Sequence, residues 1–168
     1  MSDRFRDMFS DWQDDEGPPD EFEELGHIEP HRLDEKEVRV VGVYEHQETG
    51  MPPQYFVLLQ DNRGRRVPIW IGKYEALSIS MALEGDVPDR PMTHDLLKNV
   101  IERMGGSVER IIVDDLWQST FYAKITIVRN GESLEIDSRP SDAIALALRV
   151  HAPIYVAEPV FESISEAT

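Results

Sequence analysis

The sequence contains no cysteine, and this absence excludes several kinds of chemistry at once. Disulfide bonds, zinc–thiolate centres and thiol nucleophiles all require cysteine side chains. The chain also lacks an apolar run of about 18 residues, so we expect no membrane-spanning helix. Its first residues include no apolar segment typical of a signal peptide, and the location we expect is therefore cytoplasmic.

Acidic residues outnumber basic ones, and the excess is concentrated at the N-terminus. Residues 1–37 hold 14 acidic and four basic side chains, whereas the remainder of the chain holds 19 and 13. A segment this acidic, with few aliphatic residues, buries too little surface to offset its ordering entropy. We therefore predict a flexible acidic arm over residues 1–37. The helical spacing of Phe5, Met8, Phe9 and Trp12 within it is compatible with a docking segment for a protein partner or with a loosely held tail.

The rest of the chain is long enough for one domain, predicted over residues 38–162 and followed by a tail at 163–168. Alternating and helical patterns predict an α+β fold, a mostly antiparallel sheet with about three packed helices. The expected helices cover residues 73–83, 93–104 and 141–150. The expected strands cover residues 38–44, 54–60, 66–71, 108–116, 120–129, 133–137 and 154–157.

The first and second of these helices are expected to bury apolar stripes, and polar clusters open the second and third. The stripes are Ala76, Leu77, Ile79, Ser80 and Leu83 in the first helix, and Leu96, Leu97, Val100, Ile101 and Met104 in the second. The clusters lie at residues 90–96 and 136–142, where polar side chains open the second and third helices. Thr93 and Ser141 are suitable N-cap residues, so capping alone explains part of each cluster. It does not explain His94, Asp137 or Arg139.

Five segments of the chain resemble the bifunctional nuclease domain family. They are Pro68-Ile69-Trp70-Ile71-Gly72 with Glu75-Ala76, Arg90-Pro91 with Thr93-His94-Asp95-Leu96, Phe121-Tyr122-Ala123, the stretch from Asp137 to Ala147, and Ala152-Pro153-Ile154-Tyr155-Val156. The resemblance implies hydrolysis of phosphodiester bonds in DNA and RNA. It also implies a homo-oligomer, since members of this family are thought to pair as dimers.

A nuclease without a thiol needs carboxylates that hold a divalent metal, Mg²⁺ or Mn²⁺, or a histidine base beside cationic phosphate binders. The candidate catalytic residues are His94, Asp95, Asp137, Arg139 and Asp142. The candidate metal ligands are Asp95, Asp137, Asp142 and, more weakly, Glu75. Asp137 ends a strand and Asp142 begins a helix, so we expect both at one edge of the sheet.

The alternative is a non-catalytic binding or assembly module in which the same residues stabilise the fold. Arg139 would then bridge Asp137 and Asp142, and Arg90 would pair with Asp95. The acidity of the domain favours this alternative, because a nucleic-acid binder must offset phosphate charge. The cluster of Arg63, Arg65 and Arg66 is interpreted by default as a solvated hairpin tip.

Overall fold

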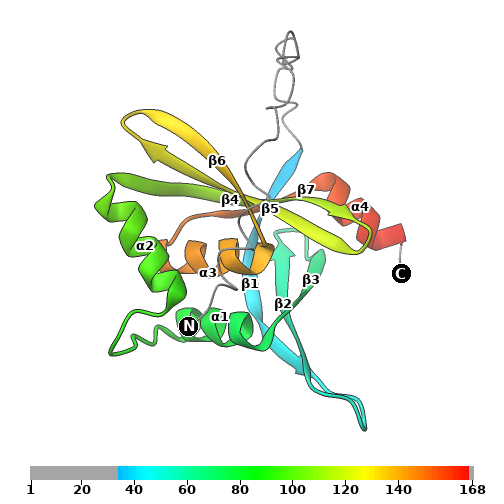
Figure 1. Ribbon diagram of the computed structural model, residues 1–168. Coiled ribbons are helices and arrows are strands. Elements are labelled where there is room, and N and C mark those ends of the chain that lie inside the picture. The colour runs from blue at the N-terminus through cyan, green and yellow to red at the C-terminus, as the bar shows by residue number, and fades with distance from the viewer. Residues whose placement is uncertain (1–33, 167–168) are drawn as a thin grey trace, which may run out of the picture. The chain divides into compact units, whose positions relative to one another are not determined.

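The structure is a computed structural model that describes residues 34–166, in which seven strands form one sheet (Figure 1). The strands are β1 (Glu35–His46), β2 (Gln54–Asp61), β3 (Arg66–Ile71), β4 (Gly106–Trp117), β5 (Thr120–Arg129), β6 (Glu132–Ser138) and β7 (Ile154–Ala157). Their order across the sheet is β3-β2-β1-β7-β4-β5-β6. Only β4 and β7 pair in parallel among the described strands, so the mostly antiparallel sheet is confirmed.

Four helices accompany the sheet: α1 (Lys73–Glu84), α2 (Thr93–Arg103), α3 (Pro140–Val150) and α4 (Glu158–Glu166). Helix α3 packs between α1 and α2 and against β4 and β5 (Figure 1). Its side chains from Ala143 to Ala147 are fully buried, as its nearly uninterrupted apolar sequence predicts. The α+β class is thereby confirmed.

The stripes predicted for α1 and α2 are buried only in part. Leu77 and Leu83 are exposed on α1, while Ser78 is buried. On α2, Ile101 packs against the core, but Leu96, Leu97, Val100 and Met104 remain exposed. The apolar pattern therefore identified the helices correctly but overestimated how much of each is covered.

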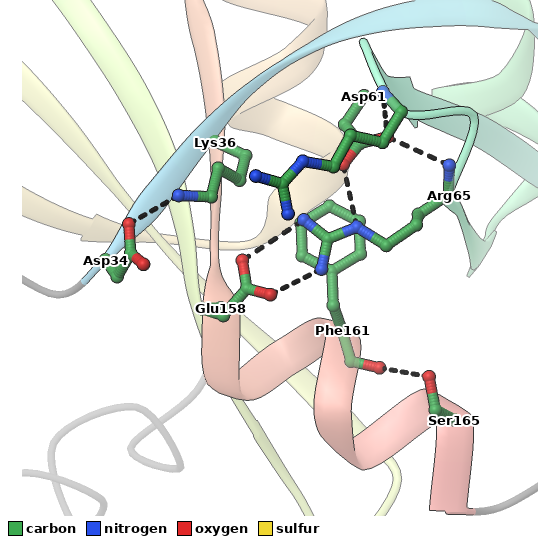
Figure 2. A network of polar contacts seen from close by, with 8 residues as sticks. Asp34, Lys36, Asp61, Arg65, Glu158, Phe161 and Ser165 are labelled. Atoms are coloured by element: carbon green, nitrogen blue, oxygen red, sulfur yellow. Dashed lines mark hydrogen bonds and ion pairs between the residues drawn. The ribbon is translucent and has the colours of Figure 1, made fainter.

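Helix α4 was not expected from the sequence, and it crosses the domain boundary predicted at residue 162. Val160 and Phe161 belong to the hydrophobic core. Arg65, in the turn between β2 and β3, pairs with Glu158 and places its guanidinium 4.0 Å from the centre of the Phe161 ring (Figure 2). Arg65 is therefore a structural contact and not part of a solvated hairpin tip, a correction to the prediction.

The predicted flexible arm falls largely on residues 1–33, which lie outside the described residues, as does its proposed docking segment. The described chain begins at Asp34, and β1 begins at Glu35, three residues before the expected start of the domain. Within residues 34–166, no helix has the length and apolar character needed to cross a membrane.

Candidate functional site

Arg139 lies at the N-terminus of α3 and is held by two carboxylates. Its Nε donates to Asp142 Oδ2 at 2.8 Å, and its Nη2 lies 2.9 Å from Glu75 Oε1 and 3.1 Å from Asp142 Oδ1. The backbone of Arg139 is extended, and Pro140 occupies the first turn of α3, where its fixed φ favours helix initiation. Arg139 therefore links α1 to α3 while 66% of its side chain stays exposed.

A histidine continues this network into the junction of the three helices. His94 Nε2 lies 3.1 Å from Asp142 Oδ1, and His94 Nδ1 lies 2.8 Å from Ser78 Oγ. An ionised carboxylate only accepts hydrogen bonds, so the network assigns a proton to Nε2. The His94 ring is buried, and it therefore positions Asp142 without reaching solvent itself.

A second arginine closes the other end of the network. Arg149 Nε donates to Asp95 Oδ1 at 2.6 Å, and Arg149 Nη2 donates to Ser78 Oγ at 3.0 Å. Asp95 Oδ2 in turn accepts the backbone N–H of Met92 at 2.9 Å, which satisfies a donor at the start of α2. One continuous polar junction thus connects α1, α2 and α3. In the order of their hydrogen bonds, its members are Glu75, Arg139, Asp142, His94, Ser78, Arg149 and Asp95.

Ser78, His94 and Asp142 are hydrogen-bonded in series, as a catalytic triad is, but through the opposite imidazole nitrogens: Ser78 contacts Nδ1 and Asp142 contacts Nε2. Ser78, however, is only 2% exposed, and its hydroxyl oxygen accepts from Arg149. A substrate carbonyl or phosphate cannot approach an oxygen that is enclosed in this way. The three residues therefore support the helix junction, and Ser78 is not a nucleophile in this arrangement.

The hydrogen bonds in the junction keep two of its carboxylates ionised. Burial acts to raise the pKa of Asp142, but the hydrogen bonds from Arg139 and His94 outweigh it and lower this pKa below its ordinary value. Burial likewise acts to raise the pKa of Asp95, and the bonds from Arg149 and the Met92 amide outweigh it. Hydrogen bonding to Asp142 raises the pKa of Arg139. Asp95, Asp142 and Arg139 therefore remain charged at neutral pH.

The ion-pair network differs from the predicted one in two of its members. Glu75 takes the place expected for Asp137 beside Arg139, and Arg149 takes the place expected for Arg90 beside Asp95. The predicted N-caps differ as well, since the capping positions are occupied by Met92 and Arg139.

Asp137 lies on the opposite face of the sheet from the three-helix junction. In β6 it pairs with Lys124 of β5, while its neighbour Ser138 pairs with the buried Ala123. Side chains alternate along a strand, so Asp137 and Ser138 point to different faces. Asp137 lines a hollow with Lys124, Asp114 and Trp117. The expected convergence of Asp137 and Asp142 at one edge of the sheet is therefore not found.

Two cavities flank the junction, and their charges differ. The cavity beside Arg139, of about 280 Å³, is lined by Trp70, Gly72, Phe121 and Ser141 among others, and no carboxylate lines it. The larger cavity at the Arg149 end, of about 480 Å³, is lined by three carboxylates, Asp86, Asp89 and Asp95. The second cavity is also lined by Lys98 and Arg149, so its acidic side chains outnumber its basic ones by one, whereas, within residues 34–166, Arg139 is the one charged side chain that lines the first. An anionic ligand is therefore better suited to the first cavity.

The carboxylates predicted as metal ligands are only partly assembled. Glu75 and Asp142 converge on the same Arg139 nitrogen, but Asp95 is bound to Arg149 and Asp137 lies on the other face. In residues 34–166, no group of three or more His, Asp or Glu side chains is arranged to hold a metal ion. Mg²⁺ commonly uses only one or two carboxylates, with water and phosphate oxygens completing its shell. Glu75 and Asp142 are therefore the pair whose chemistry suits such an ion.

Sequence patterns did not identify Ser78 and Arg149 as members of the junction. Both lie in helices whose neighbouring residues are apolar, and neither belongs to a local polar cluster. The one available signal is that an arginine within the otherwise apolar helix α3 requires a buried or bridging partner.

Three helices of this α+β domain thus meet in an arginine–carboxylate junction. The sequence model of the bifunctional nuclease domain matches residues 57–168. The match covers more than half of the chain, and the chain therefore belongs to the bifunctional nuclease domain family.

Relatives of two kinds were found. An uncharacterized protein of Mycobacterium tuberculosis (strain ATCC 25618 / H37Rv) is 43% identical over 124 residues, which cover 74% of this chain and 73% of the relative. Bifunctional nuclease 1 of Oryza sativa subsp. japonica is 27% identical over 62% of this chain, and that of Arabidopsis thaliana is 26% identical over 62%. The aligned region spans 33% of each plant protein.

Proposed function

We propose that this domain binds nucleic acid at Arg139 and hydrolyses phosphodiester bonds in DNA and RNA. The observation that carries the proposal is an exposed guanidinium, fixed by Asp142 and Glu75, at the edge of a cavity without carboxylates in its lining. A fixed guanidinium presents planar donors to phosphate oxygens, and it retains its charge at any physiological pH. The family match and the plant relatives named as bifunctional nucleases support the same activity.

The roles proposed for the junction follow from exposure and charge. Arg139 contacts the phosphate and stabilises the charge that develops during hydrolysis. Asp142 and Glu75 orient the guanidinium, and His94 and Asp95 are positioning residues, because their bonds fix Asp142 and the start of α2. A lowered pKa makes Asp142 a poor proton acceptor, so it holds a cation and does not act as a general base.

If a divalent ion takes part, Glu75 and Asp142 are the residues that would hold it. Mg²⁺ or Mn²⁺ would supply Lewis-acid stabilisation of the phosphate and a more acidic water. Asp137 remains a separate candidate for a catalytic residue, since it lies beside Lys124 and Asp114 on the other face of the sheet.

The proposal is tested by cleavage of single-stranded DNA and RNA with the purified full chain in Mg²⁺, Mn²⁺ or EDTA. The key variant is Arg139→Met, which removes the charge and keeps an unbranched side chain. We expect its cleavage rate to fall about a hundredfold, as for the loss of one transition-state donor. Arg103→Met, a change of the same kind in the last turn of α2, is the matched control for net charge and should cleave normally.

Undiminished cleavage by the folded Arg139→Met variant would refute the proposed site. Asp137→Asn, assayed in parallel, decides between the two faces of the sheet. Loss of cleavage in Asp137→Asn with normal cleavage in Arg139→Met would place the chemistry beside Lys124 instead.

A second candidate function is assembly without catalysis. It is favoured by the apolar side chains that α2 leaves exposed, namely Leu96, Leu97, Val100 and Met104. A dimer formed through α2 would cover them. Light scattering at micromolar concentration should then give twice the mass of one chain, and the mass of a monomer would contradict this candidate.

A further inference from the structure

We infer that the outer side of β1, β2 and β3 is a platform for single-stranded nucleic acid that leads toward Arg139; this inference rests on the proposed nuclease function. The strand register places Tyr44, Phe56 and Trp70 in one row across the three strands. The Tyr44 and Phe56 rings stack with centroids 5.4 Å apart, and the Phe56 and Trp70 rings meet at 5.1 Å. Trp70 is 55% exposed.

This aromatic row faces away from the core. Val57, the neighbour of Phe56 along β2, is fully buried, and so are Leu59 and, nearly, Ile69. Because side chains alternate, the row must point to the opposite side of the sheet. None of the side chains on this side of the three strands is buried; the segments concerned are Arg39 to His46, Gln54 to Gln60 and Arg66 to Trp70.

The same side carries positive charge and no carboxylate over these strand segments. Arg39 and Arg66 flank Gln60 in a second row of the register. Arg39 donates to the neutral amide of Gln60 at 3.1 Å, so its charge is not cancelled there. In residues 34–166, Arg66 forms no ion pair. Glu45 lies within β1, but alternation directs it to the other side of the sheet. On the platform side the flanking carboxylates are Glu37, two residues before Arg39, and Glu48, which follows β1 and lies 3.5 Å from His46. In a chain with net charge −16, this local balance favours an anionic ligand.

The spacing of the two rows suits a nucleic-acid strand. Trp70 lies four positions along β3 from Arg66, a distance of about 13 Å at the rise of a β-strand. A strand lying over this distance can stack bases on the aromatic row while its phosphates reach the two arginines. The platform is thus long enough for a few nucleotides.

The platform is continuous with the proposed site. Trp70 lines the same 280 Å³ cavity as Arg139 and Ser141. A strand stacked on Trp70 therefore has one phosphate within reach of the cavity that Arg139 borders. In a duplex the base faces are covered by neighbouring bases and cannot stack on side chains. The expected ligand is accordingly single-stranded DNA or RNA.

The test measures binding separately from cleavage. Fluorescence anisotropy with labelled single-stranded oligonucleotides is recorded in EDTA, and intact oligonucleotide is verified afterwards. Trp70→Ala should weaken binding about tenfold, the loss typical of one stacked base, and Trp70→Phe should recover most of it. The double change Arg39→Gln/Arg66→Gln should reduce the slope of log Kd against log salt concentration by about 1.4, because each phosphate contact on a single strand contributes about 0.7.

The matched control is Trp117→Ala. Trp117 is 62% exposed, but it lies in a hollow with Asp114, Asp115 and Asp137. It should leave oligonucleotide binding unchanged. Equal binding by wild type and Trp70→Ala, or equal loss in Trp70→Ala and Trp117→Ala, would overturn the platform.

The two proposals fail in different ways. If Arg139→Met loses cleavage while Trp70→Ala binds like wild type, the platform is wrong and the proposed active site stands. If Trp70→Ala weakens binding while Arg139→Met cleaves normally, the platform stands and the proposed active site is wrong. Duplex of the same sequence binding as tightly as the single strand would also contradict the platform.

Discussion

Two arginines of this domain are held in almost the same way and differ in what surrounds them. Arg65 lies between Asp61 and Glu158, and Arg139 lies between Asp142 and Glu75. Around Arg65, the Asp61 side chain is completely buried and also accepts the backbone N–H groups of Arg63 and Arg65 (Figure 2). Around Arg139, both carboxylates are partly exposed and a cavity lies beside the guanidinium.

The comparison shows why ion pairing alone does not separate a structural from a functional arginine. The Arg65 guanidinium also covers the ring of Phe161, and the Arg65 side chain is only 30% exposed, so its donors are directed into the protein. The Arg139 side chain is 66% exposed, and its hydrogen bonds use Nε and Nη2, so it has donors left for a ligand. The unused donors, and not the charge, mark Arg139 as the candidate for function.

The largest expected effect is on stability, and it should separate the two clusters. Asp61→Ala leaves two backbone donors and the Nε of the partly buried Arg65 without their acceptor, so we expect a loss of about 3 kcal/mol in the free energy of unfolding. Asp142→Ala removes a carboxylate that is partly exposed, and the loss should be about 1 kcal/mol. Urea unfolding of both variants measures the difference. A loss for Asp142→Ala as large as that for Asp61→Ala would mean that the Arg139 cluster is structural as well.

Acid sharpens the same comparison through the lowered pKa values. Asp61 and Asp142 both have pKa values below the ordinary 3.8, despite burial, because of their bonds to arginine. The unfolded chain therefore binds protons more readily than the native one at low pH. The stabilisation is complete above pH 3.8 and is lost as pH falls through the native values. In melting curves between pH 6 and pH 2.5, Asp61→Asn and Asp142→Asn should each lose less stability than wild type. A variant whose melting temperature falls as steeply as wild type would contradict the assignment for that carboxylate.

Local patterns predicted much of the sheet. Strand β5 begins and ends where the alternation of its side chains indicated, and the turn after it contains Asn130 and Gly131 with φ of 53° and 81°, as a two-residue hairpin turn requires. Helix α4 was missed because its nine residues form a short pattern after a strand. It is stabilised by a distant partner, Arg65, which no local window contains.

The site was predictable only as far as its residues are close in sequence. Arg139 and Asp142 share one helix N-terminus, and the sequence placed them together. Asp137 stands two residues before Arg139 in the sequence. Because β6 extends to Ser138, Asp137 still follows the alternation of that strand, and its side chain is directed to the other face of the sheet. Glu75 and Arg149 join Arg139 and Asp95 only through the packing of α1 and α2 on α3.

The smallest expected effect concerns Gly72, which precedes α1 in extended conformation. A Cβ at this position would clash with Glu75 Oε2, so Gly72→Ala must move the Glu75 carboxylate that helps to hold Arg139. The backbone itself accepts alanine, and the free energy of unfolding should change by less than about 1 kcal/mol. Under the proposed function, cleavage should fall severalfold, to the same rate as in Glu75→Ala. The double variant Gly72→Ala/Glu75→Ala should be no slower than Glu75→Ala alone, because both changes act through one side chain. Additive losses in this cycle would show that Gly72 acts on the cavity independently of Glu75.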